Sequence, residues 1–410
     1  MNNTPELLSP AGDLDKMRFG IAYGADAVYM AGTRFGMRAA ATNFDDNALR
    51  EGIAYAHARG VKCYITVNIM PSNRDLPALP AYLELLQDAG ADALIIADVG
   101  VLRMARRYAP KVPVHISTQT SILNHEAANY WADEGAERIV LARELSLEEI
   151  AEIRAKTPKE LEIEAFVHGA MCISYSGRCL ISQYMTGRDA NHGACAQPCR
   201  WNYSLMEEKR PGQFFPVEED GRGTYLYNSK DMCMIEHVPE LIEAGITSFK
   251  IEGRNKTAYY AACVTGAYRA AIDTYKKDPE NFVLPQFCRD EVNKVSHREY
   301  YTGFYFGNQE NGQHYGDSQY IREYEVVGMP VECDDSGKAV FALKNRFFDG
   351  EELELIQPGQ APYVFRAENV TDDEGTKREL FNVPQMRVHF AFPFKVSEWA
   401  ILRKVKERPE

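Results

Sequence analysis

The chain has 410 residues and a formal net charge of −13, with 45% hydrophobic and 26% charged residues, which is typical of a folded globular protein of one to three domains. It contains no apolar run long enough to cross a bilayer, and no basic segment followed by an apolar one opens it. We therefore expect a cytoplasmic protein with reduced thiols and no membrane partner. The acidic charge argues against binding to nucleic acid through bulk charge, although it leaves room for a local basic patch.

Short β-rich apolar runs alternate with helical segments through the first 275 residues. Eight such runs are predicted as strands, at 6–12, 26–32, 62–69, 92–98, 112–118, 138–142, 161–169 and 248–254. This alternation predicts an α/β fold of the (β/α)8 barrel type. An open doubly wound sheet is the alternative, but no glycine-rich dinucleotide turn follows the first run.

The alternation breaks at two places. A cysteine-rich insert at 170–235 follows the seventh run, and from about 310 the pattern changes to short strands separated by turn signals such as Asp349-Gly350. We therefore predict two domains: a barrel over 1–300 that carries the insert, and a small C-terminal antiparallel β-barrel over 310–410.

Five of the nine cysteines lie in the insert, at Cys172, Cys179, Cys195, Cys199 and Cys233. Loops that follow the strands of a (β/α)8 barrel form the face that carries chemistry, so all five thiols can reach the barrel mouth. Because we expect reduced thiols, such crowding predicts a metal-binding or catalytic role rather than disulfides.

Four interpretations of these thiols remain open on spacing alone. Cysteines without function are often buried, but the flanks here are polar and rich in glycine. Structural zinc sites usually show two tight pairs, and only Cys195 and Cys199 approach that pattern. An iron–sulfur cluster accepts looser spacing and is favoured over zinc. A single catalytic thiol activated by His168 or His192 is the fourth interpretation, but nothing singles out one thiol of five.

Polar residues at the ends of the predicted strands are candidates for the rest of the site. They are Asn68, Asp98, Gln119, Glu164, His168, Lys250, Glu252 and Arg254, together with Arg34 and Arg38 in the loop after the second run. Alternation directs Lys250, Glu252 and Arg254 to one side, where they form either a charge layer that closes the barrel or a site for carboxylates. His168 is either a hydrogen-bonded residue at a strand end or a catalytic one.

The segment 164–182 resembles the signature of the collagenase-like peptidase family. The fixed positions of that signature are filled by Glu164, Phe166, Gly169, Ala170, Cys172, Gly177, Cys179, Ile181 and Ser182. Three later segments, "GACAQPCRW", "YNSKDMC" and "FKIEGR", are also similar to motifs of the family. The resemblance covers nearly the whole chain, including the C-terminal domain.

The resemblance implies an activity, a cofactor and a ligand set. The members most similar to the whole chain are tRNA-modifying enzymes that hydroxylate the wobble uridine to 5-hydroxyuridine, with a 4Fe–4S cluster and with prephenate as the hydroxyl source. By motif, the cluster ligands are Cys172, Cys179, Cys195 and Cys233. Cys199 is expected to be a spare thiol, because Pro198 stiffens the backbone before it.

The remaining roles follow from the same resemblance and from the strand ends. We predict catalytic roles for His168, Glu164 and Lys250. Substrate contacts are predicted for Arg34, Arg38, Asn68, Gln119, Glu252 and Arg254. The expected partners are tRNA and prephenate or a similar small dicarboxylate, and related proteins that work in pairs allow a homo-oligomer or a hetero-oligomer.

Two other functions stay open. The family is named for a peptidase activity, but the chain has neither an HExxH zinc motif nor a GxSxG turn. The other is a zinc-stabilised RNA-binding protein without enzymatic activity.

Overall fold

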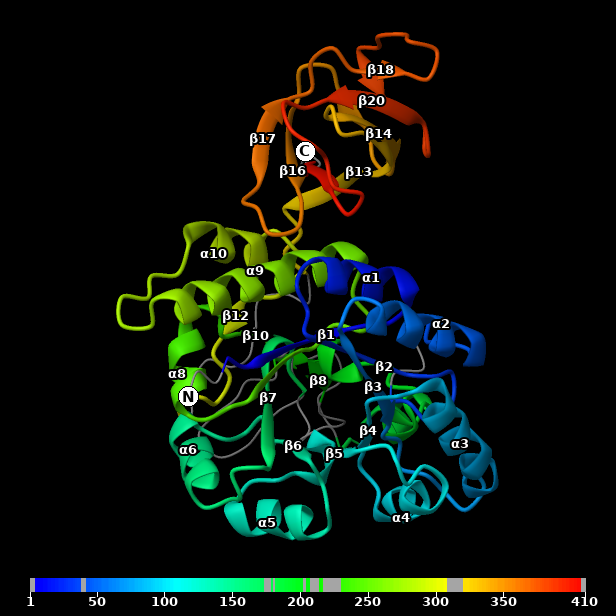
Figure 1. The fold of residues 1–410 in the computed structure, drawn as a ribbon, viewed down its shortest axis with the longest axis vertical. Coiled ribbons are helices and arrows are strands. Elements are labelled where there is room, and N and C mark those ends of the chain that lie inside the picture. Colours follow the sequence, from blue (N-terminus) through cyan, green and yellow to red (C-terminus); the bar gives the residue numbers. More distant parts are fainter. Residues whose placement is uncertain are drawn as a thin grey trace.

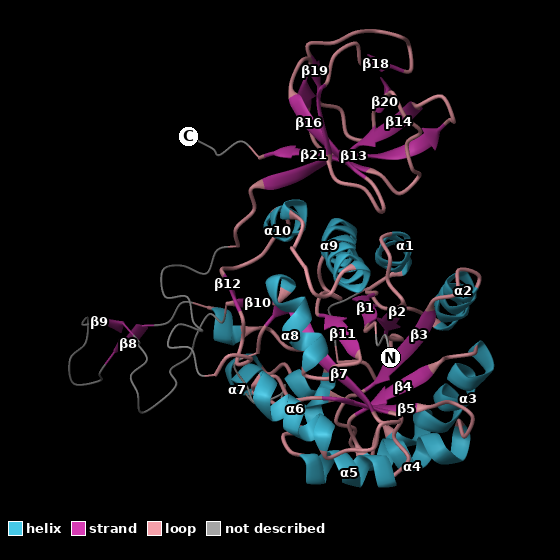
Figure 2. Cartoon of the chain, turned by 60° about the vertical axis from the view of Figure 1, so that its left-hand side comes forward, coloured by secondary structure: helices cyan, strands magenta, loops and turns pink. Residues whose placement is uncertain are grey.

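The first domain is a closed barrel of parallel strands, seen in a computed structural model that describes residues 4–37, 42–172, 178–179, 181–201, 204–206, 214–216, 230–307 and 320–406. Its eight strands are β1 (Glu6–Pro10), β2 (Ala27–Met30), β3 (Lys62–Val67), β4 (Ala93–Ile96), β5 (Val114–Ile116), β6 (Arg138–Val140), β7 (Glu162–Ala170) and β11 (Ser248–Ile251). β11 pairs with both β7 and β1 and so closes the barrel (the barrel is seen in Figure 1, and β11 is labelled in Figure 2). Each predicted run contains one strand, and the predicted (β/α)8 fold is confirmed.

Helices surround this barrel, and several begin at a capping side chain. They are α1 (Leu14–Ala22), α2 (Asp46–His57), α3 (Leu79–Ala89), α4 (Val99–Tyr108), α5 (His125–Asp133), α6 (Leu147–Ala155), α7 (Ile181–Thr186), α8 (Val238–Glu243), α9 (Ala258–Lys277) and α10 (Gln286–Asn293). Asp98, just after β4, accepts a hydrogen bond from the backbone of Val101 and starts α4 there. Among the described residues, no helix combines the length and apolar character that crossing a membrane requires.

The barrel interior holds both apolar and charged side chains. Six apolar residues of β1 to β4 form a small internal cluster, namely Leu8, Ala27, Tyr29, Tyr64, Ala93 and Ile95. The strands β6, β7 and β11 instead contribute Arg138, Glu164 and Lys250, which are almost fully buried. Buried charges are costly unless they are paired, so this interior depends on ion pairs.

The insert leaves the barrel after β7 and returns beside it. β10 (Asp231–Cys233) pairs antiparallel with the end of β7, and β12 (Tyr300–Tyr301) pairs with β10. Within the insert, β8 (Ser204–Met206) and β9 (Phe214–Pro216) form a short hairpin that lies away from the barrel (Figure 2).

The C-terminal domain is an antiparallel sheet that curls around its own core, and this part of the predicted fold is confirmed. The seven strands are, in sheet order, β17 (Tyr363–Arg366), β16 (Glu352–Ile356), β21 (Ile401–Val405), β13 (Tyr324–Cys333), β14 (Lys338–Leu343), β20 (Arg387–Ala391) and β18 (Thr371–Asp372). β15 (Phe347–Phe348) and β19 (Leu380–Phe381) form a separate pair. Phe341, Phe347 and Phe381 are fully buried in this core. The domain limits 1–300 and 310–410 stay predictions.

Buried ion pairs join the two domains. Arg403 of β21 is fully buried, and its Nη1 lies 2.6 Å from Oε2 of Glu291 on α10. Its Nε lies 2.8 Å from Oε2 of Glu354 on β16, and its Nη1 donates to the hydroxyl of Tyr259 on α9 at 3.1 Å. The C-terminal sheet therefore sits on α9 and α10 (Figures 1 and 2).

Candidate active site at the barrel mouth

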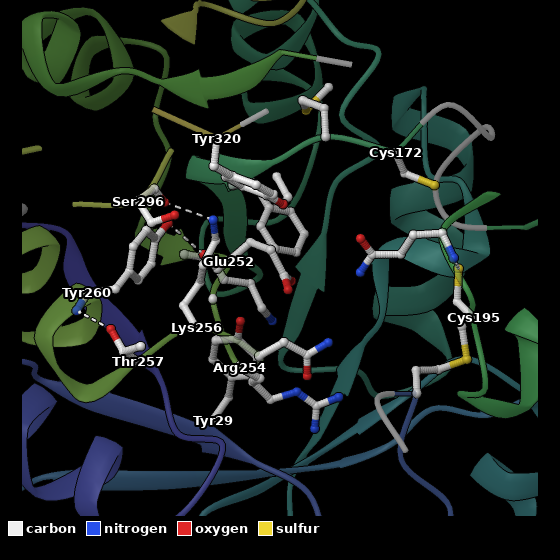
Figure 3. Close-up of a pocket in the computed structure, with 18 of the residues that line it drawn as sticks. Tyr29, Cys172, Cys195, Glu252, Arg254, Lys256, Thr257, Tyr260, Ser296 and Tyr320 are labelled. Carbon is white, nitrogen blue, oxygen red and sulfur yellow. Dashed lines mark hydrogen bonds between the residues drawn. The ribbon is translucent and has the colours of Figure 1, made fainter. Parts of the chain in front are cut away.

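A cavity of about 900 Å³ opens at the carboxyl ends of the barrel strands. Its described lining comes from the strands β2, β3, β4, β6, β7 and β11, from loops that follow the barrel strands, from the start of α9, from the insert, and from the C-terminal domain. This is the face on which (β/α)8 barrels carry their chemistry, and the volume is typical of ligand sites. Figure 3 shows this cavity with part of its lining.

One wall of the cavity carries thiols from the insert. Cys172, Cys179, Cys195 and Cys199 all line it, and Figure 3 shows Cys172 and Cys195 on the same side. Cys172 is exposed, and the other three are half-buried. The structure therefore brings together three of the four predicted ligands, and it adds Cys199, the thiol that we predict to be spare.

Cys233 lies apart from this wall. It ends β10, pairs in register with His168, and is not among the described residues that line the cavity. Burial is the main cause that raises the pKa of its thiol to about 12. Among the described residues, no group of three or more His, Cys, Asp or Glu side chains is arranged to hold a metal ion. The four thiols gathered on one wall suit a thiolate-bound centre. The position of Cys233, away from that wall, does not by itself support its place in such a centre. The predicted ligand set therefore stays a prediction.

The opposite side of the cavity carries charged groups from the segment after β11 (Figure 3). Lys256 Nζ donates to the Ser296 carbonyl at 2.9 Å and lies 4.4 Å from the ring centroid of Tyr320. Arg254 is 3% exposed, and its Nη1 donates to Thr66 Oγ1 at 3.2 Å. Arg254 and the neighbouring Glu252, both predicted to contact substrate, therefore reach the cavity.

Two glycines allow this segment to pack closely against the barrel. A Cβ on Gly169, where φ is +107°, would lie 2.4 Å from the carbonyl oxygen of Glu252. A Cβ on Gly12 would lie 2.1 Å from the carbonyl oxygen of Arg254. Both distances are far shorter than van der Waals contact, so a side chain at either position would displace the segment that carries Glu252 and Arg254.

Glu164 and Lys250 form a buried ion pair at the base of the cavity. Lys250 Nζ lies 2.6 Å from Glu164 Oε1, and Arg138 Nη1 lies 3.0 Å from Glu164 Oε2. Burial by itself would raise the pKa of Glu164, but Lys250 and Arg138 outweigh burial and lower it. Lys250 lines the cavity, whereas Glu164 is not among the described lining residues. Arg138 also pairs with Glu6 and Glu162, so a charge layer lies inside the barrel. It contains Lys250, whereas Glu252 and Arg254, the other two residues of the predicted layer, line the cavity.

His168 packs behind the cavity wall. It is 1% exposed, and its Nε2 and Nδ1 lie 3.3 and 3.5 Å from the hydroxyls of Tyr300 and Tyr268. Burial is the largest cause that lowers its pKa to about 3, so the ring is neutral at physiological pH. His168 is not among the described lining residues, which favours the hydrogen-bonded residue at a strand end over a catalytic one.

Asn68 and Gln119 form a preorganised amide pair in the lining. Asn68 Nδ2 donates to Gln119 Oε1 at 2.8 Å, and Gln119 Nε2 donates to the carbonyl of Asn68 at 2.9 Å. By contrast, Arg34 pairs with Asp46 at 2.7 Å near the surface and is not among the described lining residues. Arg38 lies outside the described residues.

Sequence reasoning missed Arg143, which lies in the loop after β6. Its Nη1 donates to the Ala170 carbonyl at 2.9 Å, and its guanidinium carbon lies 3.9 Å from the ring centroid of Phe166. Its buried Nε has no hydrogen-bond partner within the part of the chain that the structure describes. Arg143 follows the predicted strand 138–142 directly. Choosing polar residues at the ends of predicted strands, as was done for Asn68, could therefore also have selected Arg143.

The described lining is positively charged although the whole chain is acidic. It contains two carboxylates, Glu252 and Glu325, against seven cations. The cations are Arg143, Lys250, Arg254, Lys256, Arg322, Lys344 and Lys406. The last three belong to the C-terminal domain, and no motif marked them. A hollow lined by one sign of charge concentrates the opposite sign, so this arrangement suits an anionic ligand.

Comparisons with known proteins identify the family. Residues 12–315 match peptidase family U32, and residues 322–403 match the peptidase family U32 C-terminal domain. The chain is 39% identical over 404 residues to tRNA hydroxylation protein P1 of Bacillus subtilis (strain 168), covering 98% of this chain and 95% of that protein. It is 37% identical over 419 residues to tRNA hydroxylation protein P of Escherichia coli (strain K12), covering 90% of each. A third relative, the 23S rRNA 5-hydroxycytidine C2501 synthase of Escherichia coli (strain K12), is 40% identical over 332 residues, covering 80% of this chain and 48% of that protein. The chain therefore belongs to peptidase family U32.

Proposed function

We propose that this protein is a tRNA-modifying enzyme that hydroxylates the wobble uridine to 5-hydroxyuridine. Two relatives that match it over at least 90% of its length are tRNA hydroxylation proteins, and a third makes 5-hydroxycytidine in 23S rRNA. These names have in common the hydroxylation of RNA, and two of the proteins match both domains of this chain.

The observation that carries the proposal is the cationic cavity with thiols on one wall. A wobble nucleotide lies in a single-stranded loop, where its base can be turned out without breaking a pair. Its phosphates would meet the cations of the lining, and the edge of its base could approach the thiol wall. Prephenate or a similar small dicarboxylate is the proposed hydroxyl source, and Arg143, Lys250 and Arg254 are the cations proposed to hold its carboxylates.

The proposed cofactor is a 4Fe–4S cluster bound by Cys172, Cys179, Cys195 and Cys233. Three of these thiols line the cavity, and thiolates are the usual ligands of such clusters. When bound, a cluster supplies redox-active iron beside the substrate. Metal analysis tests this cofactor, since iron with sulfide supports the cluster, whereas zinc in a colourless preparation supports a zinc-stabilised RNA-binding protein.

The protein's own side chains would bind and orient the reactants. Lys250 is held by Glu164, so its ammonium group has a fixed position at the base of the cavity. The amide pair of Asn68 and Gln119 offers donors and acceptors suited to a base or a carboxylate. Arg143 lines the cavity, and its guanidinium group is a cation suited to an anionic ligand.

Nucleoside analysis of tRNA from cells that lack this protein tests the function. We expect 5-hydroxyuridine at the wobble position to disappear, and the wild-type gene to restore it. Arg143→Met should restore less, because it removes a cation from the cavity. The control Arg106→Met removes an exposed arginine that pairs with Glu134 outside the lining, and it should restore the modification fully. Unchanged hydroxylation in the deletion strain, in a cell without a second enzyme of this activity, would contradict the proposal.

The peptidase alternative has its own test. Purified protein should leave collagen-type substrates intact, and cleavage that is abolished by substitutions at the barrel mouth would favour that alternative instead.

A further inference from the structure

A second hollow lies in the C-terminal domain beside the main cavity. It has a volume of about 390 Å³ and is lined in part by Arg346 and Asn382. The two hollows share Glu325, Lys344, Asn345 and Lys406. They therefore form one continuous surface that runs from the barrel mouth across the residues that follow β14 and β21.

This continuous surface is basic. Arg322, Lys344, Arg346 and Lys406, which we call the basic strip, line one or both hollows, against one carboxylate, Glu325, of the same domain. Lys344 and Lys406 are exposed, and among the described residues neither forms an ion pair. Exposed cations without acidic partners are available to an external anion.

An aromatic ring lies between the basic strip and the barrel. Tyr320 lines the main cavity, and Lys256, Arg298 and Arg322 lie 4.4, 4.8 and 5.6 Å from its ring centroid. Aromatic rings beside cations are typical of surfaces that bind single-stranded nucleic acid, because bases stack on the ring while phosphates meet the cations.

The orientation of the basic strip relative to the mouth is fixed by the interface between the domains. Lys406 follows directly after β21, the strand that carries Arg403. Arg403 is anchored by Glu291 of the first domain and by Glu354 of the second. The strip is therefore attached to the same rigid contact that seats the C-terminal sheet on α9 and α10.

We propose that the basic strip binds the phosphates of the substrate RNA that flank the nucleotide in the barrel, so that the C-terminal domain is an RNA-binding part of the enzyme. This inference rests on the proposed function. A nucleotide that enters the cavity is joined on both sides to phosphates, and at least one flanking chain must leave through the mouth. The strip begins at that mouth and carries the charge that phosphates require.

Equilibrium binding of a transcribed tRNA to the full-length protein, measured over a range of salt concentrations, tests this inference. Each phosphate contact releases counterions, so removing one lysine lowers the slope of log affinity against log salt by about 1. The double variant Lys344→Ala/Lys406→Ala should therefore lower the slope by about 2 and weaken binding about a hundredfold at 0.1 M salt, relative to any change in affinity extrapolated to 1 M salt.

The matched control is Lys338→Ala/Lys377→Ala. Both lysines are exposed residues of the same domain, and neither lines either hollow. Lys377 follows β18, which lies at the end of the domain far from the barrel (Figure 1). The control should keep the wild-type affinity and slope. An equal loss in both double variants, or no loss in the first, would overturn the inference.

Kinetics separate a failure of this inference from a failure of the proposed function. The strip is proposed to bind phosphates rather than the base, so the double variant should raise the KM for tRNA by a larger factor than it lowers kcat at saturating tRNA. If the wild type hydroxylates tRNA while the double variant has an unchanged KM, only the strip is refuted. If the wild type neither hydroxylates tRNA nor binds it in a salt-dependent way, the proposed function itself is refuted.

Discussion

Glu164 lies at the point where the barrel interior meets the cavity, and it pairs with two cations, Arg138 and Lys250, that extend in different directions. Arg138 joins it to the charge layer inside the barrel, whereas Lys250 extends from it into the cavity. An ionised carboxylate that is fully buried is tolerated only with such partners. We therefore propose that Glu164 is a positioning residue that holds Lys250.

This role predicts a large loss of stability in Glu164→Gln. The change leaves Lys250 without its anionic partner and Arg138 with one partner fewer, so the free energy of unfolding at pH 7 should fall by about 3–5 kcal/mol. Chemical denaturation measures the effect. The control Glu162→Gln removes a carboxylate that also pairs with Arg138 but is 45% exposed, and it should cost much less.

The same variant has a defined pH dependence. The pKa of Glu164 is lowered in the folded protein below its ordinary value of about 4.3. As the pH falls, Glu164 of the unfolded chain takes up a proton before Glu164 of the folded protein does. The stabilisation that ionised Glu164 contributes is therefore complete above about pH 4.3, and it is lost as the pH falls through the lowered pKa of the folded protein. The gap in stability between the wild type and Glu164→Gln should therefore narrow below about pH 4.3. A gap that widens on acidification would show that Glu164 is not the ionised partner of Lys250.

The selection of polar residues at strand ends located much of the cavity, whereas His168, chosen by the same rule, is not among the described lining residues. Lys250, Glu252, Arg254, Asn68 and Gln119 all reach the lining, because each lies at the carboxyl end of a strand or just beyond it.

The position of the His168 side chain behind the cavity wall comes from an irregularity in the pairing of β7 with β11. Lys250 pairs with Phe166, and the next residue, Ile251, pairs with His168, so β7 contains one extra residue at Val167. Such a bulge changes the face on which the next side chain lies, and His168 packs among tyrosines behind the wall. Local sequence does not reveal a bulge of this kind.

At the scale of elements, the insert shows which features of the thiol wall could be predicted from the sequence and which could not. The position of the insert after β7 was predictable from the interrupted alternation. The sequence also predicted that all five thiols can reach the barrel mouth. Which of them share one wall was not predictable, because for Cys199 it depends on the backbone between Cys195 and Cys199. Gln197 has a φ of +57°, and Pro198–Arg200 form a turn of 3-10 helix, so both thiols line the same cavity. Pro198 therefore does not exclude Cys199 from the wall.

A serine series tests the proposed ligand set. Four thiolates fill the four iron corners of a 4Fe–4S cube, so one of the five thiols must be spare. We expect Cys199→Ser to keep its iron and sulfide, and Cys172→Ser, Cys179→Ser, Cys195→Ser and Cys233→Ser to lose much of theirs after anaerobic purification. Cys333→Ser, in the C-terminal domain, is the control for loss through handling.

The opposite pattern at two positions would replace the ligand set. If Cys199→Ser loses iron while Cys233→Ser keeps it, the two thiols of "CAQPC" supply two corners, in agreement with their common wall. Retention of metal in all five variants would remove the cluster from the proposal altogether.

At the scale of the whole molecule, local pattern predicted the two folds but not their assembly. The barrel follows from eight repeats of strand and helix, each readable in a short window. The contact between the domains depends on Arg403 meeting Glu291, which lies 112 positions earlier in the chain. Nothing in the sequence near either residue marks that pair, so the C-terminal share of the cavity lining was not foreseen.

Arg403→Met should therefore affect both the stability and the assembly of the molecule. Among the described residues, it leaves Lys294 as the remaining cation for the buried carboxylate of Glu291 and the partly buried one of Glu354. Breaking such a buried pair costs about 3–5 kcal/mol. Small-angle scattering should report a larger spread of domain orientations, and the KM for tRNA should rise because the basic strip is no longer held at the mouth. The control Arg366→Met, at an exposed arginine of β17, should change neither.

A triple variant separates stability from positioning. Arg403→Met combined with Glu291→Gln and Glu354→Gln removes the uncompensated charges, so much of the lost stability should return, since replacing a whole buried ion network is often close to neutral. The directional contacts that seat β21 on α10 would still be absent, and the KM for tRNA should stay high. If the triple variant recovers the wild-type KM together with stability, the network only stabilises the fold, and the C-terminal domain does not need a fixed orientation to serve the barrel.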